Sequence, residues 1–373
     1  MIASEWTVDR AVLPHTVQLR TRIAASDERI LAVDQEPAAP GAPHLAGTLL
    51  PGLVDLQVNG AGGRSVDEAT PEALNAVAEA VWAGGAAAFL PTLITAEWGP
   101  LLDQVRAVAR WCRDWPGQAR GAEPLGLHLE GPFLATAGAH PEQHFVDPTP
   151  QRIDELLAAA DGQLRLVTLA AARPLAAAAT RRFVAAGTTV ALGHCQSSDG
   201  FTDCVDAGAR SVTHLFNVMG RIHHRELGPA ALALDDDRVL CPTIVDGVHV
   251  HQAMVRLAFR TLGPDRFALV TDAVAAAGMP DGNYQLSGID VTAKDGVVRD
   301  RNGNLAGSAL TMALAAKRFL RYVDEAGPWT LARIASHNPA RLIGAEPFGS
   351  LQPGARPAFT LMEPDGSLRC LRA

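Results

Sequence analysis

The middle of the chain repeats one pattern three times, in LGLHLE (125–130), LRLVTLA (164–170) and TTVALGH (188–194). Each run is short and mostly apolar on successive residues, and longer Ala-rich stretches separate the runs. A run that does not alternate with polar residues is typical of a strand buried on both faces, as in a parallel sheet. The stretches between the runs carry apolar residues at helical spacing, so the pattern predicts repeated strand–helix units.

The same pattern continues on both sides of this central part. Five further apolar runs bring the number to eight: LVDLQV (53–58), AAFLPTL (87–93), SVTHLF (211–216), LCPTIVDG (240–247) and FALVTDA (267–273). Helical spacing is clear in residues 71–83 and 101–112 and weakest in the sixth connection, near 229–236. Eight buried strands with helices between them predict a (β/α)8 barrel of the TIM type over residues 51–345.

The two ends of the chain follow a different pattern. Residues 1–50 and 346–373 contain short β-like runs separated by polar residues and turn dipeptides such as Pro353-Gly354. We expect both ends to fold together as one small accessory domain, a β-sandwich. An insertion at 281–304 contains several Gly turns, and it predicts a hairpin before the last barrel helix.

The composition excludes several classes of protein. Of the 373 residues, 48% are hydrophobic and 19% are charged, which is typical of a globular chain and not of a disordered one. The net charge of −8 argues against a broadly basic surface for nucleic acids. Five cysteines without a CxxC pair are typical of reduced thiols, and we find neither a secretory leader pattern nor an apolar run of the ~20 residues that span a bilayer. We therefore expect a cytoplasmic protein without membrane or nucleic-acid partners.

Polar residues close several of the predicted strands. In a barrel the carboxyl ends of the strands share one rim, and catalytic groups lie there. A Glu, two His and an Asp from four different strands fit a divalent metal ion with an acid or base beside it. One such residue alone is more often structural, but four at the same rim favour a single site. The rim residues are Gln57, Asn59, His128, Glu130, His194, His214, Asp246, His249 and Asp272.

The amino-acid sequences of the segments around these residues resemble those of a known family. In order along the chain they read PGLVDLQVNGAGG (51–63), HLEGPF (128–133), GAHP (138–141), LGHCQS (192–197), THLFNVM (213–219), HHRELG (223–228), DGVHVH (246–251), TDAVAAAG (271–278) and LAGSAL (305–310). Together they resemble the N-acetylglucosamine-6-phosphate deacetylases of the amidohydrolase superfamily, over about residues 50–345. The resemblance implies a metal-dependent hydrolase that converts N-acetylglucosamine 6-phosphate to glucosamine 6-phosphate and acetate. It also implies the barrel and the accessory β-sandwich.

Roles for individual residues follow from the resemblance. It implies that Glu130, His194 and His214 hold one divalent ion, with zinc as the expected ion. It implies that Asp272 is the catalytic acid and base and that His140 lies near the acetyl carbonyl. The positions that resemble the substrate-binding residues of the family are Ala139, His140, Asn217, Val218, Arg225, Asp246, Gly247, Val248, His249, Leu305, Ala306 and Gly307.

Two of these positions suggest the phosphate pocket. Arg225 and His249 would meet the phosphate, since the planar guanidinium of Arg reaches phosphate oxygens with two hydrogen bonds. In such enzymes the phosphate pocket is completed across a dimer interface, so the resemblance implies a homodimer.

One departure concerns the number of metal ions. Many superfamily members carry His-x-His at the end of the first strand, where it binds a second ion, whereas this chain has Gln57-Val58-Asn59. Amide side chains are poor zinc ligands, so we expect a single ion.

Two alternatives remain open. The first is a hydrolase for another substrate, such as a cyclic amide or a different N-acetyl amino sugar; Arg225 with His249 favours a phosphorylated sugar. The second is a sugar-phosphate-binding protein whose hydrolytic site has decayed, and only Gln57 and Asn59 support it.

Overall fold

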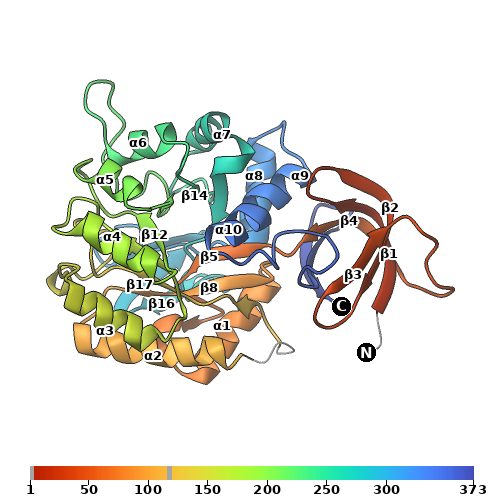
Figure 1. The fold of residues 1–373 in the computed structure, drawn as a ribbon, viewed down its shortest axis with the longest axis horizontal. Helices are drawn as coiled ribbons and strands as arrows, with labels where there is room; N and C mark the ends of the chain where they lie inside the picture. Colours follow the sequence, from red (N-terminus) through yellow and green to blue (C-terminus); the bar gives the residue numbers. More distant parts are fainter. Residues whose placement is uncertain (1–3, 116–119) are drawn as a thin grey trace.

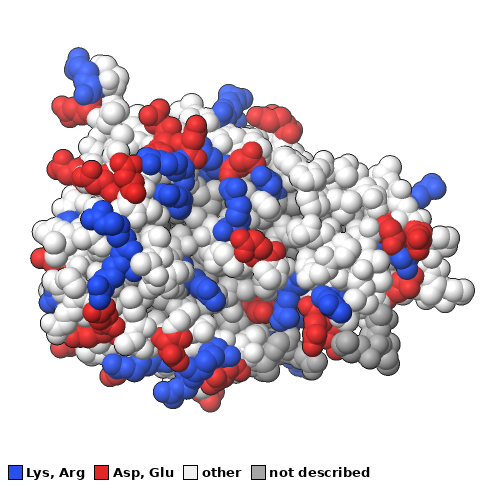
Figure 2. Space-filling model, viewed as in Figure 1, with Lys and Arg blue, Asp and Glu red and all other residues white. Residues whose placement is uncertain are grey.

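The computed structural model describes residues 4–115 and 120–373. Figure 1 shows a larger part, in which helices surround a set of strands, and a smaller part of strands where both termini lie. Figure 2 shows that basic and acidic side chains are interspersed on the face in view and form no extended patch of one sign.

Every predicted buried run contains a strand. In chain order the eight strands are β5 (Val54–Val58), β8 (Ala88–Ile94), β10 (Leu127–Glu130), β11 (Leu164–Leu169), β12 (Thr189–Leu192), β13 (Ser211–Val212), β14 (Cys241–Ile244) and β15 (Phe267–Val270). The first six are neighbours in one parallel sheet, and β14 and β15 form a parallel pair. Single bridges, Ser211 to Leu240 and Val58 to Ala273, join the two sheets at both ends. The arrangement is TIM-like, as predicted.

Helices connect these strands and cover their outer side (Figure 1). Several begin at a Thr that caps the helix: the Thr70 hydroxyl accepts a hydrogen bond from the backbone N–H of Ala73, and Thr149 does the same for Arg152. The weakly predicted sixth connection does contain a helix, which is short. The helices are α1 (Pro71–Ala83), α2 (Trp98–Arg113), α3 (Pro150–Ala160), α4 (Ala176–Ala185), α5 (Phe201–Asp206), α6 (Pro229–Asp235), α7 (Gln252–Arg266), α8 (Met312–Tyr322), α9 (Pro328–Ala332) and α10 (Asn338–Leu342).

The two ends of the chain share one sheet, as predicted. Its six strands lie in the order β20 (Leu368–Arg372), β19 (Ala358–Met362), β4 (His44–Pro51), β1 (Ser4–Val12), β2 (Val17–Ala25) and β3 (Ile30–Asp34). The sheet has a small core of its own, in which the ring of Trp6 meets the ring of Phe359 edge-on with centroids 5.5 Å apart. The closing of this sheet into a two-layered sandwich stays a prediction.

The insertion near residue 290 has one strand more than the predicted hairpin. It is an antiparallel sheet of β16 (Gly282–Leu286), β17 (Ile289–Lys294) and β18 (Val297–Asp300). Two two-residue turns, Ser287-Gly288 and Asp295-Gly296, connect the strands, and all four residues have positive φ. Such turns match the twist of paired strands, which explains the second hairpin. Leu286 packs in one cluster with Ile94 of β8, so this sheet lies over the rim where the strands end.

Smaller elements complete the chain. None of the helices within the described ranges is long and apolar enough to cross a membrane. All five cysteines are buried and unpaired. The short strands are β6 (Gly60–Ala61), β7 (Arg64–Ser65) and β9 (Glu123–Pro124), the 3-10 helices are η1 (Val66–Glu68) and η2 (Glu142–His144), and a π-helical turn, η3 (Arg333–His337), lies between α9 and α10.

Candidate active site

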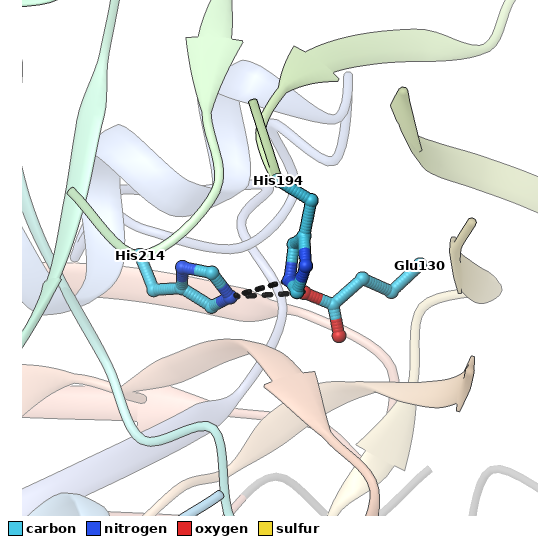
Figure 3. Close-up of side chains that lie close together, drawn as sticks. All are labelled: Glu130, His194 and His214. Carbon is cyan, nitrogen blue, oxygen red and sulfur yellow. Dashed lines mark hydrogen bonds and ion pairs between the residues drawn. The ribbon is translucent and has the colours of Figure 1, made fainter. Parts of the chain in front are cut away.

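Three side chains from strands of one parallel sheet converge at the rim of the larger part. Glu130 is the last residue of β10, and His194 and His214 each lie two residues beyond the end of a strand, β12 and β13. Figure 3 shows the carboxylate of Glu130 and both imidazole rings pointing toward one another. Oε1 of Glu130 lies 3.0 Å from Nε2 of His194 and 2.9 Å from Nε2 of His214, and the two Nε2 atoms are 3.3 Å apart.

This geometry fits a metal ion. Tetrahedral zinc with Zn–N bonds of ~2.0–2.1 Å places its ligand atoms about 3.3 Å apart, which is the separation of the two Nε2 atoms. Nδ1 of His194 lies 3.0 Å from the carbonyl oxygen of Thr136, so it is the protonated nitrogen and Nε2 keeps its lone pair for a ligand. Nδ1 of His214 is buried and has no hydrogen-bond partner within the described part of the chain. The three residues form a cluster that could hold one ion.

The electrostatics of Glu130 keep it ionised. Burial raises its pKa, but the hydrogen bonds and charges of His140, His194 and His214 outweigh burial and hold the pKa well below its ordinary value. In return, Glu130 raises the pKa of His214 to about 8 against the opposing effect of burial. A buried carboxylate with its oxygens directed at imidazoles is the donor arrangement expected of a metal centre.

His140 lies beside the cluster. Its Nδ1 is 2.9 Å from Oγ1 of Thr95 and 3.4 Å from the backbone N of Thr95, while its Nε2 is 3.4 Å from Oε2 of Glu130. Because the backbone N–H of Thr95 can only donate, Nδ1 is the acceptor and Nε2 carries the proton. Burial lowers the pKa of His140, which favours this neutral form. His140 therefore presents an N–H donor at the edge of the cluster.

Asp272 follows β15 by two residues and lies against the end of β5. One of its oxygens, Oδ1, accepts hydrogen bonds from Nε2 of Gln57 at 2.9 Å and from Nδ2 of Asn59 at 2.8 Å. The other oxygen makes no hydrogen bond to the described residues. Burial and the charge of Glu130 raise the pKa of Asp272 to about 6. A carboxylate with one oxygen held and the other available is suited to accept and return a proton near neutral pH.

The backbone at these positions is unusual. His194, His214 and Asp272 have φ values of 51°, 31° and 52°, in the left-handed region that residues with a side chain seldom adopt. Such a conformation costs free energy and persists only where the surroundings impose it, as at active sites. Each of the three strands thus turns sharply just where its functional side chain leaves it.

One pocket is lined by Glu130, His140, His194, His214 and Asp272. Its wall includes Gly138, where an added Cβ would lie 3.0 Å from a methyl of Val218 and 3.3 Å from the ring of His194, so a side chain there would crowd the site. Seven of the predicted substrate-binding residues line the pocket: Ala139, His140, Asn217, Val218, His249, Leu305 and Gly307. The other predicted positions, Arg225, Asp246, Gly247, Val248 and Ala306, are not among the lining residues.

Asp246 acts on the pocket through His249. Its Oδ2 lies 2.6 Å from Nδ1 of His249, and its Oδ1 accepts hydrogen bonds from the backbone N–H groups of Val248 and His249. Asp246 therefore orients a ring that lines the pocket without lining the pocket itself.

Arg225 lies outside the pocket of its own chain. It belongs to the loop 221–227, whose residues are all exposed, including the apolar Ile222 and Leu227. Figure 1 shows the chain between α5 and α6 projecting beyond both helices.

Sequence reasoning missed the apolar wall of the pocket and one of its supports. Ile94, Ile244 and Leu286 line the pocket, and Thr95 contacts His140. An apolar residue at the end of a buried run looks like any other core residue, and Leu286 lies in an insertion far along the chain, so neither carries a recognisable signal.

Comparisons with known proteins show which family and which relatives this chain resembles. The model of the amidohydrolase family matches residues 48–370. An N-acetylgalactosamine-6-phosphate deacetylase of Escherichia coli O157:H7 is 35% identical over 84% of this chain and 83% of its own length, and an N-acetylglucosamine-6-phosphate deacetylase of Vibrio furnissii is 33% identical over 86% and 80%. Among solved structures, a mutant N-acetyl-D-glucosamine-6-phosphate deacetylase from Mycobacterium smegmatis in complex with N-acetyl-D-glucosamine-6-phosphate has a TM-score of 0.93 and 34% identity, covering 100% of this chain and 98% of that one.

The cluster predicts a defined metal content. We expect purified protein to contain about one divalent ion per chain by elemental analysis, and His214→Ala to fall well below that because one of three donors is lost. His15→Ala, which removes an exposed histidine far from the cluster, is the matched control and should keep the full content. Equal metal content in the two variants would contradict the assignment.

Proposed function

The chain belongs to the amidohydrolase family, and we propose that it hydrolyses the N-acetyl group of N-acetylglucosamine 6-phosphate, yielding acetate and glucosamine 6-phosphate. The observation that carries the proposal is the cluster of Glu130, His194 and His214 in one pocket with Asp272 and His140. The relatives that are named for this reaction, at about a third identity over most of the chain, favour the same substrate class.

Glu130, His194 and His214 would hold a single divalent ion, with zinc as the expected one. When bound, such an ion polarises an amide carbonyl and lowers the pKa of a water molecule. A single ion agrees with the chemistry of Gln57 and Asn59, because amide side chains are poor zinc ligands and these two donate hydrogen bonds to Asp272 instead.

The side chains of the protein carry out the proton transfers. Asp272 uses its unengaged oxygen to take a proton from the water molecule as that water attacks the acetyl carbon. Nε2–H of His140 donates a hydrogen bond to the developing oxyanion, a contact worth roughly 2.7–4 kcal/mol at comparable sites. Asp272 then returns the proton to the amine nitrogen as the C–N bond breaks, which releases acetate and the free amine.

A second candidate substrate is the C4 epimer. A relative with 35% identity is named for N-acetylgalactosamine 6-phosphate, and both sugars present the same acetamido and phosphate groups. The choice between the epimers therefore depends on contacts at one hydroxyl.

Acetate release tests the proposed function directly. We expect turnover of N-acetylglucosamine 6-phosphate that a chelator abolishes and a divalent ion restores. Unphosphorylated N-acetylglucosamine should be hydrolysed with a much lower kcat/KM, because the phosphate-binding groups remain unused. N-acetylgalactosamine 6-phosphate as a parallel substrate separates the two candidates. Equal kcat/KM for the phosphorylated and unphosphorylated sugars would contradict a sugar-phosphate hydrolase.

Replacement of Asp272 tests its role as the base. Asp272→Asn should lower kcat by roughly 10²–10⁴-fold, the usual contribution of general acid–base catalysis, while the metal content stays at the wild-type level. The same charge removed from the surface, in Asp281→Asn, is the control and should leave kcat unchanged. A near-normal kcat in Asp272→Asn would exclude Asp272 as the base.

The proposed role of Asp272 also predicts how kcat/KM depends on pH. Asp272 must be ionised to accept a proton, and burial with the charge of Glu130 raises its pKa to about 6. A bound cation lowers this pKa, so kcat/KM should fall on acidification with a midpoint at or below about pH 6. The acid limb should be absent from the residual activity of Asp272→Asn.

We also propose that the chain acts as a homodimer. The exposed loop 221–227 carries Arg225 together with Ile222 and Leu227, and Arg225 does not line the pocket of its own chain. Arg225 of one subunit would meet the phosphate in the pocket of the other, while His249, oriented by Asp246, meets it from within.

Mixing two inactive variants tests this arrangement. A mixed dimer of Arg225→Ala and Asp272→Asn has one site that combines an intact Asp272 with an intact Arg225 from the other subunit. If subunits exchange at random, half of the dimers are mixed, so about a quarter of the wild-type activity should return. No recovery, with subunit exchange verified separately, would contradict the shared pocket.

We also propose how the chain divides into domains and where the protein is located in the cell. Residues 51–345 would form the hydrolase unit, and residues 1–50 with 346–373 the accessory unit, a small β-sandwich. The proposed cytoplasmic location rests on the five unpaired thiols.

A further inference from the structure

Asp55 is a buried carboxyl group that the proposed reaction does not use. It lies on β5, is 2% exposed and is not among the residues that line the pocket. No ion pair joins it to any basic side chain in the described ranges. Burying a carboxylate without a cation is costly, so a group of this kind needs a reason beyond packing.

The hydrogen bonds of Asp55 cross the seam between β5 and β15. These two strands end separate sheets, and at their carboxyl ends a single bridge, Val58 to Ala273, joins them. Below that bridge, Oδ1 of Asp55 accepts a hydrogen bond from the backbone N–H of Thr271 at 3.2 Å, and Oδ2 accepts one from the Thr271 hydroxyl at 2.5 Å. Oδ1 also accepts from the backbone N–H of Gln57 at 3.4 Å. A side chain thus supplies the pairing that the two backbones lack there.

The residue that Asp55 holds is next to Asp272. Thr271 precedes Asp272, whose backbone has a φ of 52° and needs external restraint. The restraint comes from both sides: Asp55 holds Thr271 from β5, while Ser308 donates its hydroxyl to the carbonyl oxygen of Thr271 and its N–H to that of Asp272.

The same seam determines how the carboxylate of Asp272 is oriented. Gln57 and Asn59, which hold Oδ1 of Asp272, belong to β5 and the residue after it, whereas Asp272 follows β15. A shift of β15 relative to β5 would break both of these hydrogen bonds. The distance across the seam therefore decides which oxygen of Asp272 stays free.

The pKa of Asp55 depends on its burial, on its hydrogen bonds and on the nearby charge of Asp272. Burial raises its pKa to about 7, the hydrogen bonds from Thr271 and Gln57 lower it, and the charge of Asp272 raises it. The two carboxyl groups are thus close enough to influence each other, although no contact between them is present.

We propose that Asp55 is a positioning residue: through Thr271 it holds β15 against β5, so that Asp272 keeps its left-handed backbone and presents one free oxygen to the pocket. The inference rests on the proposed role of Asp272 in hydrolysis. Asp55 touches neither substrate nor metal ligand in this proposal and acts on the reaction through Thr271 and the seam.

Kinetics of four variants test the proposal. Asp55→Asn and Thr271→Val should each lower kcat by roughly 10–100-fold, because a displacement of about 1 Å at a reacting group costs that much, with KM and metal content near wild-type values. Thr271→Ser keeps the hydroxyl and should restore most of kcat. The matched control is Thr243→Val: Thr243 is equally buried on the neighbouring β14, but its hydroxyl bonds to the carbonyl of Cys241 in its own strand, so kcat should stay unchanged.

The double variant and a crystal structure complete the test. Asp55→Asn combined with Thr271→Val should be no slower than the slower single variant, because the two substitutions remove the same connection between Asp55 and Thr271. In crystals of Asp55→Asn, Asp272 should lose its hydrogen bonds to Gln57 and Asn59 or its positive φ. An unchanged Asp272 there, or a kcat no lower than that of Thr243→Val, would overturn the positioning role. If the wild-type protein hydrolyses neither sugar phosphate, the proposed function fails, and the crystal structure still decides whether Asp55 positions Asp272.

Discussion

The buried charge of Glu130 is the constraint on which the site depends. A carboxylate at 3% exposure is stable only with charged or hydrogen-bonding partners, and Glu130 has three imidazoles within 3.4 Å of its oxygens. His194 follows β12 and His214 follows β13, the second and third strands from β10 in the sheet. The parallel order of β10, β11, β12 and β13 therefore brings both imidazoles to Glu130. The sharp turns at His194 and His214 aim the rings inward, and the carbonyl of Thr136 selects which nitrogen of His194 is free. The order of the sheet, the turns and the tautomer together accommodate this one charge.

On the opposite side of the rim, two amide side chains orient the carboxylate of Asp272. Gln57 and Asn59 donate to a single oxygen of Asp272, which leaves the other oxygen available for the proposed proton transfer. These two amides are therefore the hydrogen-bond partners that the structure gives this buried carboxylate. Because an amide hydrogen bond lowers the pKa of a carboxyl less than a nearby cation does, Asp272 keeps a pKa that is raised by burial and suited to a base.

Much of the fold could be predicted because burial on both faces leaves a clear pattern in the chain. Each of the eight apolar runs contains a strand, and the polar residues that close these runs, Glu130, His194, His214 and Asp272, lie at one rim. The insertion near residue 290 has one strand more than the predicted hairpin, although its second turn, Asp295-Gly296, can be recognised in the sequence. The roles implied for Asp246 and Arg225 needed the structure for a different reason. The first residue orients a neighbouring ring, and the second lies on a loop outside its own pocket, and neither relation leaves a periodic signal.

The amino-acid sequence is sufficient to predict the order of the strands along the chain, the rim on which polar groups gather and the types of side chain available there. These are local properties, because the burial of a strand and the chemistry of its last residue can be recognised within a few positions. Three contacts become apparent only in the folded chain: Leu286 lines the pocket, Thr95 sets the proton on His140, and Asp55 joins the two strands beneath Asp272. The contact between Asp55 and Thr271 connects residues 216 positions apart, so it exists only once the first and last strands of the larger part lie side by side.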